Sequence, residues 1–564
     1  MQEYFKKYLT KQNVFIFLLC IVALLFRLAN IDAYFWYDEA CSHLVARESF
    51  PFGINEFLWN KDLQHTPLYF YILNLWMKIF GEGDVSIKSL SILFGMAMLP
   101  LIFFLTKKLA NEKAAFIVLI LASVNVCMVL YSQEARMYSM VMFLALLSSN
   151  YLVDWTKTQK KSDLIKLSVV NILIPYTLVG AIAFNIAQFI CYFAYLTIKR
   201  LRVKDWLISG GVTLLALIPY FIIVGHYNAI RSTFIVSHVS DFAVQNVIEI
   251  LRNFLSTNVG AVFWAGYGGY EITFFFICAV IIPAAYMLTA IFRSVFRNKE
   301  ENSGIIKLFF AIIVLVFAFN IFFAMQKTIV LATRYVVYVL PLVLILASIG
   351  ISKLRKWHIA LFLLYFSLFS LYDIYTNQKM NRLKETQLYL PAKTIGSFGL
   401  TKDDLVIVPF GSSVFYRYYD IENNSDVWIF ELLQEYRRPE NRNFYTEEQT
   451  VSFKEDFHKT LQEIVLKDDY ISPNFYRYIK ENVANRVAKS RYVVFNLYGP
   501  DISSAIPPDM MKEIYADIEN VKRSPNNALF AKSNNDLRDI MLEDFNIIDV
   551  IEIPDNLIVI FQRK

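Results

Sequence analysis

The sequence predicts an α-helical protein that spans a membrane many times and ends in a polar α/β region. The 564-residue chain is 56% hydrophobic and 18% charged, with a mean hydropathy of +0.41, a combination that is rare in soluble domains. Apolar runs near the roughly 20 residues needed to cross the hydrocarbon core recur from Val14 to about Tyr375. Residues 1–376 are therefore expected to form a membrane domain.

The first apolar run, from Val14 to Ile31, follows Lys6, Lys7 and Lys11 and so resembles a signal peptide. It is too long for the apolar region of such a peptide and lacks an obvious small-residue cleavage site. We therefore expect a retained first span in a multi-pass protein of the cell membrane, with the N-terminus in the cytoplasm because of the lysines.

The positive-inside rule orders the other runs if residues 67–80, at about fifteen residues, are an aromatic-rich interfacial helix too short to cross. All five cytoplasmic loops are then rich in Lys and Arg, and about eleven spans leave the C-terminus outside. The later spans are expected at residues 86–106, 114–131, 137–154, 163–179, 181–198, 206–224, 271–293, 305–324, 335–352 and 357–375.

Residues 377–564 change character and predict an extracytoplasmic α/β domain. Residues 405–408 and 492–495 are apolar and β-branched, as is typical of strands. Ser472-Pro473 predicts the start of a helix that runs to about Ala488. Residues 547–553 and 557–561, separated by Pro-Asp-Asn, predict a terminal hairpin.

Composition also excludes several classes of protein. The net charge of +6 does not indicate nucleic-acid binding, because the basic residues cluster beside the spans. The five cysteines show neither disulfide nor metal-binding spacing, and no ligand set stands out, so no cofactor is expected and a divalent metal stays open. No nucleotide-binding motif is present. Group transfer outside the cytoplasm would then need a donor already activated in the membrane.

The most chemically loaded polar residues fall at the outer ends of the apolar runs. Asp38 and Glu39 follow the first span; Asp38 could simply cap a helix, which is the commoner role, or remove a proton from a hydroxyl. His65 could mark a helix entry or orient a substrate, and the residues leave both open.

The turn from Tyr131 to Tyr138 is the densest polar cluster between two spans. On a helix, Gln133 and Arg136 would share one face, and Glu134 and Tyr138 another. An internal Glu–Arg pair is the alternative, but an arginine at this boundary suits a phosphate. The candidates for positioning a substrate are His65, Gln133, Glu134 and Tyr138.

Two further arginines lie near the outer boundary. Positive-inside logic gives Arg334, beside Tyr335, no topological reason to be outside, so a phosphate contact is favoured over snorkelling to headgroups. Arg27, within the first span, is expected either to contribute to the site or to form an ion pair with Asp32 or Glu39.

Four segments together resemble glycosyltransferase family 39, whose members use polyprenyl-phosphate sugars, include protein O-mannosyltransferases and look related to the lipid A aminoarabinose transferases. The resemblance covers roughly residues 13–155, and RYVVYVLP near residues 334–341 is a weaker match. The four segments are WYDEACSHLVARE, HTPLYFYILNLWMKIFG, SIKSLSILFGMAMLPLIFFLTKKL and YSQEARMYSMVMFLALL.

The resemblance implies a GT-C fold with an outward-facing site under the first outer loop. It implies that Asp38, with Glu39 beside it, acts as a catalytic base, and that Arg136, Arg334 and Tyr335 hold the lipid phosphate of the donor. The family often has His-Pro-Pro where this chain has His65-Thr66-Pro67. It often has a His-Tyr pair where residues 176–179 contain no histidine, which weakens a metal or substrate role there.

Together these expectations describe an inverting glycosyltransferase that uses a polyprenyl-phosphate monosaccharide and a hydroxyl acceptor on a lipid, protein or glycan. One alternative is a flippase or transporter of lipid-linked sugars, which would show repeats and broken helices near the midplane. Neither feature is evident in the sequence. The other alternative is a non-catalytic membrane protein of envelope assembly.

Overall fold

The structure is a computed structural model that describes residues 11–29, 31–60, 65–201, 203–233, 244–255, 280–298, 301–326, 331–408, 426–429, 490–498, 545–553 and 556–564. The chain divides into two compact units. The first comprises residues 1–33 and 45–380, and the second comprises residues 34–44 and 381–564. The predicted boundary at residue 376 lies inside a continuous helix, and the assignment of two domains to the membrane and the outer face stays a prediction.

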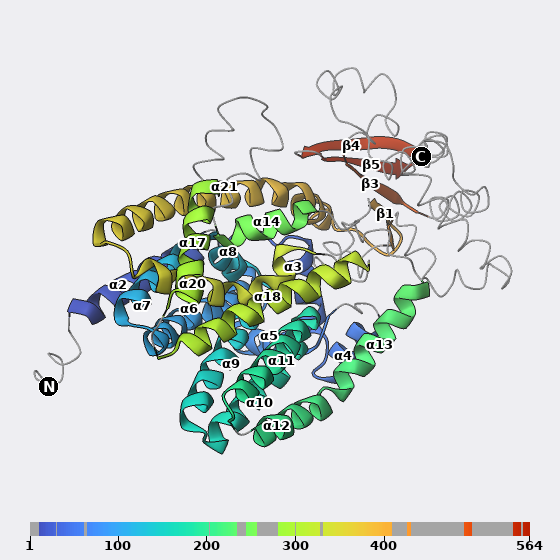
Figure 1. Ribbon diagram of the computed structural model, residues 1–564. Helices are drawn as coiled ribbons and strands as arrows, with labels where there is room; N and C mark the ends of the chain where they lie inside the picture. Colours follow the sequence, from blue (N-terminus) through green and yellow to red (C-terminus); the bar gives the residue numbers. More distant parts are fainter. Residues whose placement is uncertain are drawn as a thin grey trace, which may run out of the picture. The chain divides into compact units, whose positions relative to one another are not determined.

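The first unit is built from helices (Figure 1). In chain order they are α2 (Lys11–Leu28), α4 (Phe52–Asn60), α5 (Leu68–Phe80), α6 (Asp84–Leu109), α7 (Glu112–Val124), α8 (Val126–Gln133), α9 (Tyr138–Thr158), α10 (Lys161–Thr177), η1 (Val179–Ala181), α11 (Ile182–Ile198), α12 (Val203–Ala216), α13 (Ile218–Thr233), α14 (Val244–Leu255), α17 (Ile282–Phe296), α18 (Ser303–Met325), α19 (Thr333–Val336), η3 (Val337–Val339), α20 (Leu340–Ile351) and the first part of α21 (Lys356–Gly396).

Helix length and composition bear out the prediction of a multi-pass membrane protein. Within the described residues, five helices are long and apolar enough to cross a membrane, or up to seven if each of two bent helix pairs counts as one span. The helices α2, α5 and α17 are apolar but shorter. The count of about eleven spans and the cytoplasmic N-terminus stay predictions, as does the interfacial position of α5.

Two predicted spans are broken, which corrects the expectation of continuous helices. Residues 114–131 form α7 and α8, which meet at 51°, and residues 206–224 form α12 and α13, which meet at 46°. At the first break Asn125 has extended backbone angles, and its side chain accepts a hydrogen bond from Met128 N at the start of α8. At the second break Pro219 supplies no N–H for the helix ladder.

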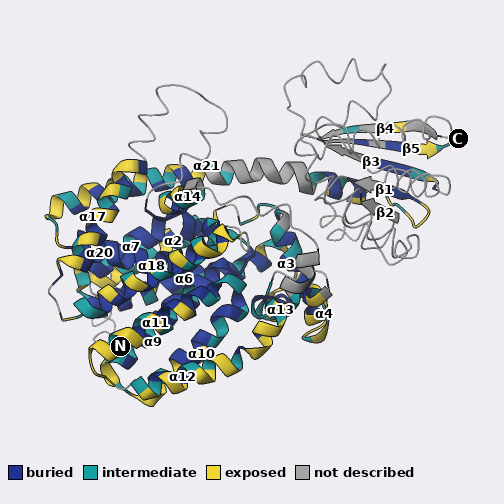
Figure 2. Cartoon of the chain, turned by 45° about the vertical axis from the view of Figure 1, so that its right-hand side comes forward, coloured by how far each residue is buried: buried dark blue, intermediate teal, exposed yellow. Residues whose placement is uncertain are grey.

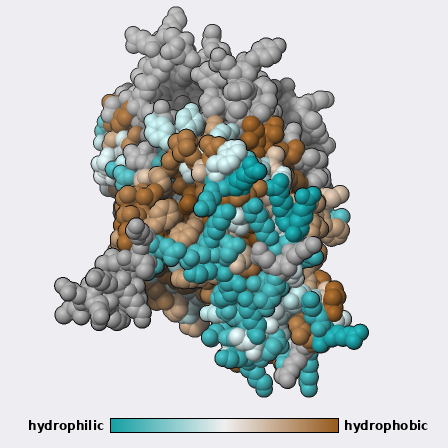
Figure 3. Space-filling view, turned by 60° about the vertical axis from the view of Figure 1, so that its left-hand side comes forward, coloured by the Kyte–Doolittle hydropathy of each residue, from teal (hydrophilic) through white to brown (hydrophobic). Residues whose placement is uncertain are grey.

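Burial separates an inner layer of helices from an outer one. Every residue of α20 is buried, whereas α12 exposes apolar side chains such as Leu214 and Leu215 (Figure 2). Figure 3 shows one face on which hydrophilic side chains gather beside a band of hydrophobic ones. Exposed apolar side chains around a packed centre, next to polar ends, are the pattern expected of helices in a lipid bilayer.

A closed polar triad holds α9, α10 and α11 together inside this packed layer. Ser148 Oγ donates to Asn171 Oδ1 at 2.6 Å, Asn171 Nδ2 donates to Gln188 Oε1 at 2.8 Å, and Gln188 Nε2 donates to Ser148 Oγ at 2.9 Å. All three side chains are buried. Hydrogen bonds between membrane helices fix their mutual register because each polar group needs a partner away from water.

The second unit contains a five-stranded mixed sheet in the order β2-β1-β3-β5-β4. The pairs β1–β2 and β1–β3 are parallel, and β3–β5 and β4–β5 are antiparallel. The strands are β1 (Leu405–Val408), β2 (Asp426–Ile429), β3 (Tyr492–Tyr498), β4 (Phe545–Ile553) and β5 (Asn556–Arg563). The predicted strands and the terminal hairpin are thus confirmed, whereas the helix predicted at Ser472 to Ala488 lies outside the described residues.

Candidate functional site

The predicted phosphate-binding residue Arg136 lies in a tight turn between α8 and α9. Residues 134–137 are not helical, so the expectation that Gln133 and Arg136 share a helix face, and Glu134 and Tyr138 another, is wrong. Arg136 N donates to Glu134 O at 2.7 Å across the turn. The side chain of Arg136 is only 3% exposed, so its charge acts in surroundings of low dielectric constant.

The turn brings Arg136 against His65, which precedes α5 in the chain. Arg136 Nη2 lies 2.7 Å from His65 Nε2. Because a guanidinium has no acceptor atom, Nε2 must accept this hydrogen bond, and the imidazole is then neutral with its proton on Nδ1. Two residues that the sequence predicts separately, in two different loops, therefore contact each other directly.

Residues of α5 and α6 form hydrogen bonds that hold this turn in place. Ser91 Oγ, on α6, donates to the Arg136 carbonyl oxygen at 3.2 Å, and Tyr69 OH, on α5, lies 3.5 Å from Ser91 Oγ. Thr66 Oγ1 donates to Pro175 O at 3.0 Å and ties the segment after His65 to the end of α10. The backbone of both loops is thus anchored to helices whose residues are buried.

Tyr131 lies where the remaining predicted residues of the first unit gather. Its ring packs edge-on against Tyr138 with centroids 5.0 Å apart. It is also within electrostatic range of Glu134 and of Arg334. The Arg334 guanidinium lies 5.1 Å from the centroid of the Tyr335 ring. The structure therefore brings the segment around Arg334 to the turn that carries Arg136.

Helix α3 (Tyr37–Arg47), whose residues 37–44 belong to the second unit, carries the predicted acidic pair, and the two carboxylates differ in burial. Glu39 is 3% exposed and its Oε2 accepts a hydrogen bond from Trp36 N at 3.1 Å, as in a capping box. Asp38 is half-buried in the first turn of the helix. Glu39, and not Asp38, therefore supplies the cap; the role of Asp38 as base and its meeting with the arginines stay predictions.

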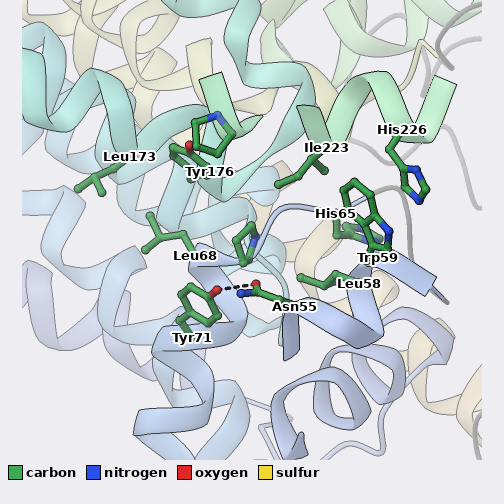
Figure 4. Close-up of a pocket in the computed structure, with 12 residues that line it drawn as sticks. Asn55, Leu58, Trp59, His65, Leu68, Tyr71, Leu173, Tyr176, Ile223 and His226 are labelled. Carbon is green, nitrogen blue, oxygen red and sulfur yellow. Dashed lines mark hydrogen bonds between the residues drawn. The ribbon is translucent and has the colours of Figure 1, made fainter. Parts of the chain in front are cut away.

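A cavity of about 400 Å³ opens beside His65 and is mostly apolar (Figure 4). On one side Trp59 of α4 stacks on His226 of α13, with ring centroids 3.7 Å apart and planes 5° apart. Tyr71 OH donates to Asn55 Oδ1 on its wall. The residues that line the cavity come from α4, α5, α10, α13 and the segment before α5: Asn55, Leu58, Trp59, His65, Pro67, Leu68, Tyr71, Leu173, Tyr176, Pro219, Ile223 and His226.

Gln133 does not point to this cavity. Its Nε2 donates to Phe26 O at 2.9 Å and to Ala29 O at 2.6 Å, which are carbonyls at the end of α2. Its Oε1 accepts from Gln378 Nε2 at 3.4 Å. The predicted role of Gln133 in positioning a substrate therefore has to act through the backbone of the turn that follows it.

The sequence analysis assigns no role to two residues near α8. The sequence places Tyr131 at the edge of the motif and Asp373 of α21, which is fully buried, within a predicted span. Cys127 lies within electrostatic range of both Asp373 and Glu134. A carboxylate in the outer part of the last apolar run was the available signal. Among the described residues, no group of three or more His, Cys, Asp or Glu side chains could hold a metal ion.

Comparison with known proteins places this geometry in context. The family model of dolichyl-phosphate-mannose-protein mannosyltransferases matches residues 64–224, which include His65, Arg136 and most residues lining the cavity. No curated protein sequence matches the chain.

Solved structures resemble the chain over nearly its whole length. ArnT from Cupriavidus metallidurans in the apo state is 10% identical, with 98% of each chain covered and a TM-score of 0.54. The same protein bound to undecaprenyl phosphate gives a TM-score of 0.52 at 10% identity, covering 97% of this chain and 98% of that one. The apo oligosaccharyltransferase of Archaeoglobus fulgidus is 11% identical, with 99% of this chain and 89% of that chain covered and a TM-score of 0.51.

At such identities the shared feature is the fold. The chain has the GT-C fold of these transferases, and the family match in residues 64–224 confirms its resemblance to glycosyltransferase family 39.

Proposed function

We propose that this chain is an integral-membrane glycosyltransferase. It moves a sugar from a polyprenyl-phosphate monosaccharide to a hydroxyl acceptor on the extracytoplasmic side, with inversion at the anomeric carbon. The match to mannosyltransferases over residues 64–224 and the shared fold support the reaction class. The undecaprenyl phosphate bound to ArnT from Cupriavidus metallidurans supports the kind of carrier.

The observation that carries the proposal is the pair of Arg136 and His65 at the edge of the apolar cavity. His65 lines the cavity and accepts a hydrogen bond from the buried guanidinium of Arg136. A cationic group beside an apolar, aromatic-walled space suits an amphiphile with a phosphate at one end and a hydrocarbon chain at the other. A polyprenyl-phosphate sugar is such a molecule.

In the proposed reaction the Asp38 carboxylate removes the proton of the acceptor hydroxyl, and that oxygen attacks the anomeric carbon of the donor. The bond between this carbon and the phosphate oxygen breaks, its electron pair goes to the phosphate, and polyprenyl phosphate leaves. Arg136 and Arg334 offset the negative charge that grows on the phosphate. Electrostatic stabilisation of this kind is worth about two to three orders of magnitude in rate for each donor group.

Glu39 supports Asp38 in this scheme by holding the start of α3, since its carboxylate accepts from Trp36 N. Glu134, Tyr138 and Tyr335 shape the surroundings of the two arginines. The acceptor is a hydroxyl of a lipid, a protein or a glycan. Residues 377–564 are proposed to be extracytoplasmic, as the charge distribution of the loops predicts.

The test is to incubate the purified protein in lipid with polyprenyl-phosphate monosaccharides that carry a radiolabelled sugar, together with membrane, protein and glycan acceptors. A transferase releases polyprenyl phosphate in step with labelling of the acceptor. Arg136→Met is the matched negative control, because it removes the cation and keeps an unbranched side chain. Release of sugar without acceptor labelling, or no release from any donor, would contradict the proposal.

A flippase of lipid-linked sugars is the second candidate. The observation that favours it is the two bent helix pairs, which are not evident in the sequence. Transporters often bind substrates at broken helices. After the break at Asn125, however, the short helix α8 leads directly to the turn that contains Arg136. The break therefore places the candidate site at the end of α8 and not at the break itself. Movement of an intact donor between leaflets of sealed vesicles, without release of polyprenyl phosphate, would identify a flippase.

A further inference from the structure

The turn that carries Arg136 is held by reciprocal hydrogen bonds between α2 and the broken pair α7–α8. From α8, Gln133 Nε2 donates to Phe26 O and Ala29 O at the C-terminal end of α2. From α2, Arg27 Nη2 donates to Ala122 O at 3.2 Å, and its Nη1 to Ser123 O at 3.3 Å. Gln133 at the end of α8 thus donates to carbonyls at the end of α2, and Arg27 near the end of α2 donates to carbonyls at the end of α7.

These carbonyls need partners because of where the helices end. The last four carbonyls of a helix have no N–H partner within it. Helix α7 ends at Val124, so Ala122 and Ser123 belong to this set, and Asn125 diverts the chain into α8. In a membrane interior water is scarce, and a carbonyl without a hydrogen-bond partner is strongly destabilising. Arg27 therefore makes the break tolerable.

Arg27 itself is placed unusually for a charged side chain. It is fully buried, and its hydrogen bonds run to the backbone oxygens of Ala23, Ala122 and Ser123. The expected ion pair with Asp32 or Glu39 is not found among the described contacts of Arg27, so that expectation is wrong. The negative end of the α7 dipole supplies the compensating partial charge.

A close helix contact leaves this assembly little freedom. A Cβ atom at Gly95 of α6 would lie 2.1 Å from Ser132 Oγ of α8 and 3.3 Å from Arg27 Nε. Gly95 thus allows α6 to pack directly against the end of α8, one residue before Gln133. Helix α8 is clamped between α6 and α2 immediately before the turn.

We propose that Arg27 and Gln133 are positioning residues, which fix the angle of α8 and thereby hold Arg136 where it meets the donor phosphate. Neither residue touches the substrate. The inference rests on the proposed function for the role of Arg136, but the placement of the turn can be tested without any reaction. Misplacing a catalytic group by about 1 Å typically costs about 100-fold in rate.

The experiment uses the purified full chain in lipid and the variants Gln133→Met and Arg27→Lys. Gln133→Met keeps the length and removes the donors; Arg27→Lys keeps the charge but loses the planar group that reaches two carbonyls. Gln188→Met is the control, because it removes a buried amide of the triad in α9–α11. Hydrogen exchange of residues 126–137 and transfer kinetics are measured for each.

We expect both variants to raise exchange in residues 126–137 at least about tenfold, whereas Gln188→Met leaves this segment unchanged. We expect kcat/KM for the donor to fall about 10- to 100-fold in Gln133→Met. In an Arg136→Met background the same change should cost little more, because residues that act through one another are not additive.

Two results would overturn the inference: unchanged exchange in residues 126–137, or additive losses in the Arg136→Met background, which would show a merely structural role. If the wild-type protein transfers no sugar, the proposed function fails, and the exchange data alone still support or overturn the placement of the turn by Arg27 and Gln133.

Discussion

Arg136 Nη2 lies 2.7 Å from His65 Nε2 although 71 residues separate them in the chain. The contact joins the basic turn after α8 to the wall of the apolar cavity. The contact also identifies the donor and the acceptor. The Arg136 guanidinium donates, and His65 Nε2 can accept only if the imidazole is neutral. A donor phosphate beside Arg136 would therefore meet a cation whose direction is set by His65.

His65→Ala should weaken binding of polyprenyl phosphate, and His65→Gln should largely preserve it. A glutamine can still present an oxygen to Arg136, whereas alanine removes the acceptor. A hydrogen bond to a charged group is worth about 1.5–3 kcal/mol, which corresponds to roughly 10- to 100-fold in affinity. Titration of the purified protein with polyprenyl phosphate measures this. Equal affinities for His65→Ala and the wild type would contradict the role.

Substitutions of the two carboxylates of α3 should have different effects, one on transfer activity and the other on stability. Asp38→Asn should lower transfer by about 100-fold or more while donor binding persists, because the base is lost. Glu39→Ala should instead lower the free energy of unfolding by about 1 kcal/mol, because Trp36 N loses its partner. Transfer assays and thermal unfolding distinguish these outcomes. Full activity of Asp38→Asn in a folded protein would remove it as the base.

Much of the helical framework could be predicted from the sequence because apolar length alone specifies it. The runs predicted at residues 86–106 and 305–324 lie within α6 and α18. The hairpin of β4 and β5 followed from two β-rich runs and a turn signal between them. The resemblance to glycosyltransferase family 39 came from four short segments, and the site residues Arg136 and His65 were among them.

The breaks and the details of the turn could not be predicted, because they depend on partners distant in the chain. At the break after α7, Arg27 on another helix donates hydrogen bonds to the carbonyls of Ala122 and Ser123, which the helix end leaves open. Their spacing predicts that Gln133 and Arg136 share one helix face, but helix α8 ends at Gln133. An isolated sequence carries no signal for these tertiary contacts, and local propensity is a weak guide where they decide.

The stability of the sheet in the second unit should depend on pH through Asp404. Burial acts to raise the pKa of Asp404, but hydrogen bonds from Arg491 and Thr401 outweigh it, and the pKa is lowered. A lowered pKa in the folded state contributes stability that is present above the unfolded value, about 3.9, and is lost as the pH falls through the folded value.

We therefore expect exchange protection of residues 405–408, corrected for the intrinsic effect of pH, to fall below about pH 4. Arg491→Met should lower protection at neutral pH and flatten this loss, because the buried carboxylate then lacks its cation and its folded-state pKa rises toward the unfolded value. Asp404→Asn should reduce protection at neutral pH and make it independent of acid. A wild-type profile in Arg491→Met would show that the ion pair does not control the stability of β1.

The packing of α17 against α20 should tolerate no side chain at Gly350. A Cβ atom there would lie 1.8 Å from the carbonyl oxygen of Ala290, and because that oxygen is backbone, the two helices would have to separate. Close approach at small residues is a main source of stability between membrane helices. Gly350→Ala should therefore lower stability by at least about 2 kcal/mol.

Gly211 of α12 is the matched control, because a Cβ atom there meets nothing within 4 Å. Gly211→Ala should leave Tm unchanged or raise it slightly, since alanine favours a helix by roughly 0.5–1 kcal/mol over glycine. Thermal unfolding in detergent compares the two variants directly. If Gly350→Ala melts with Gly211→Ala, then α17 and α20 do not meet at Ala290 and Gly350, and the buried layer around α20 must pack differently.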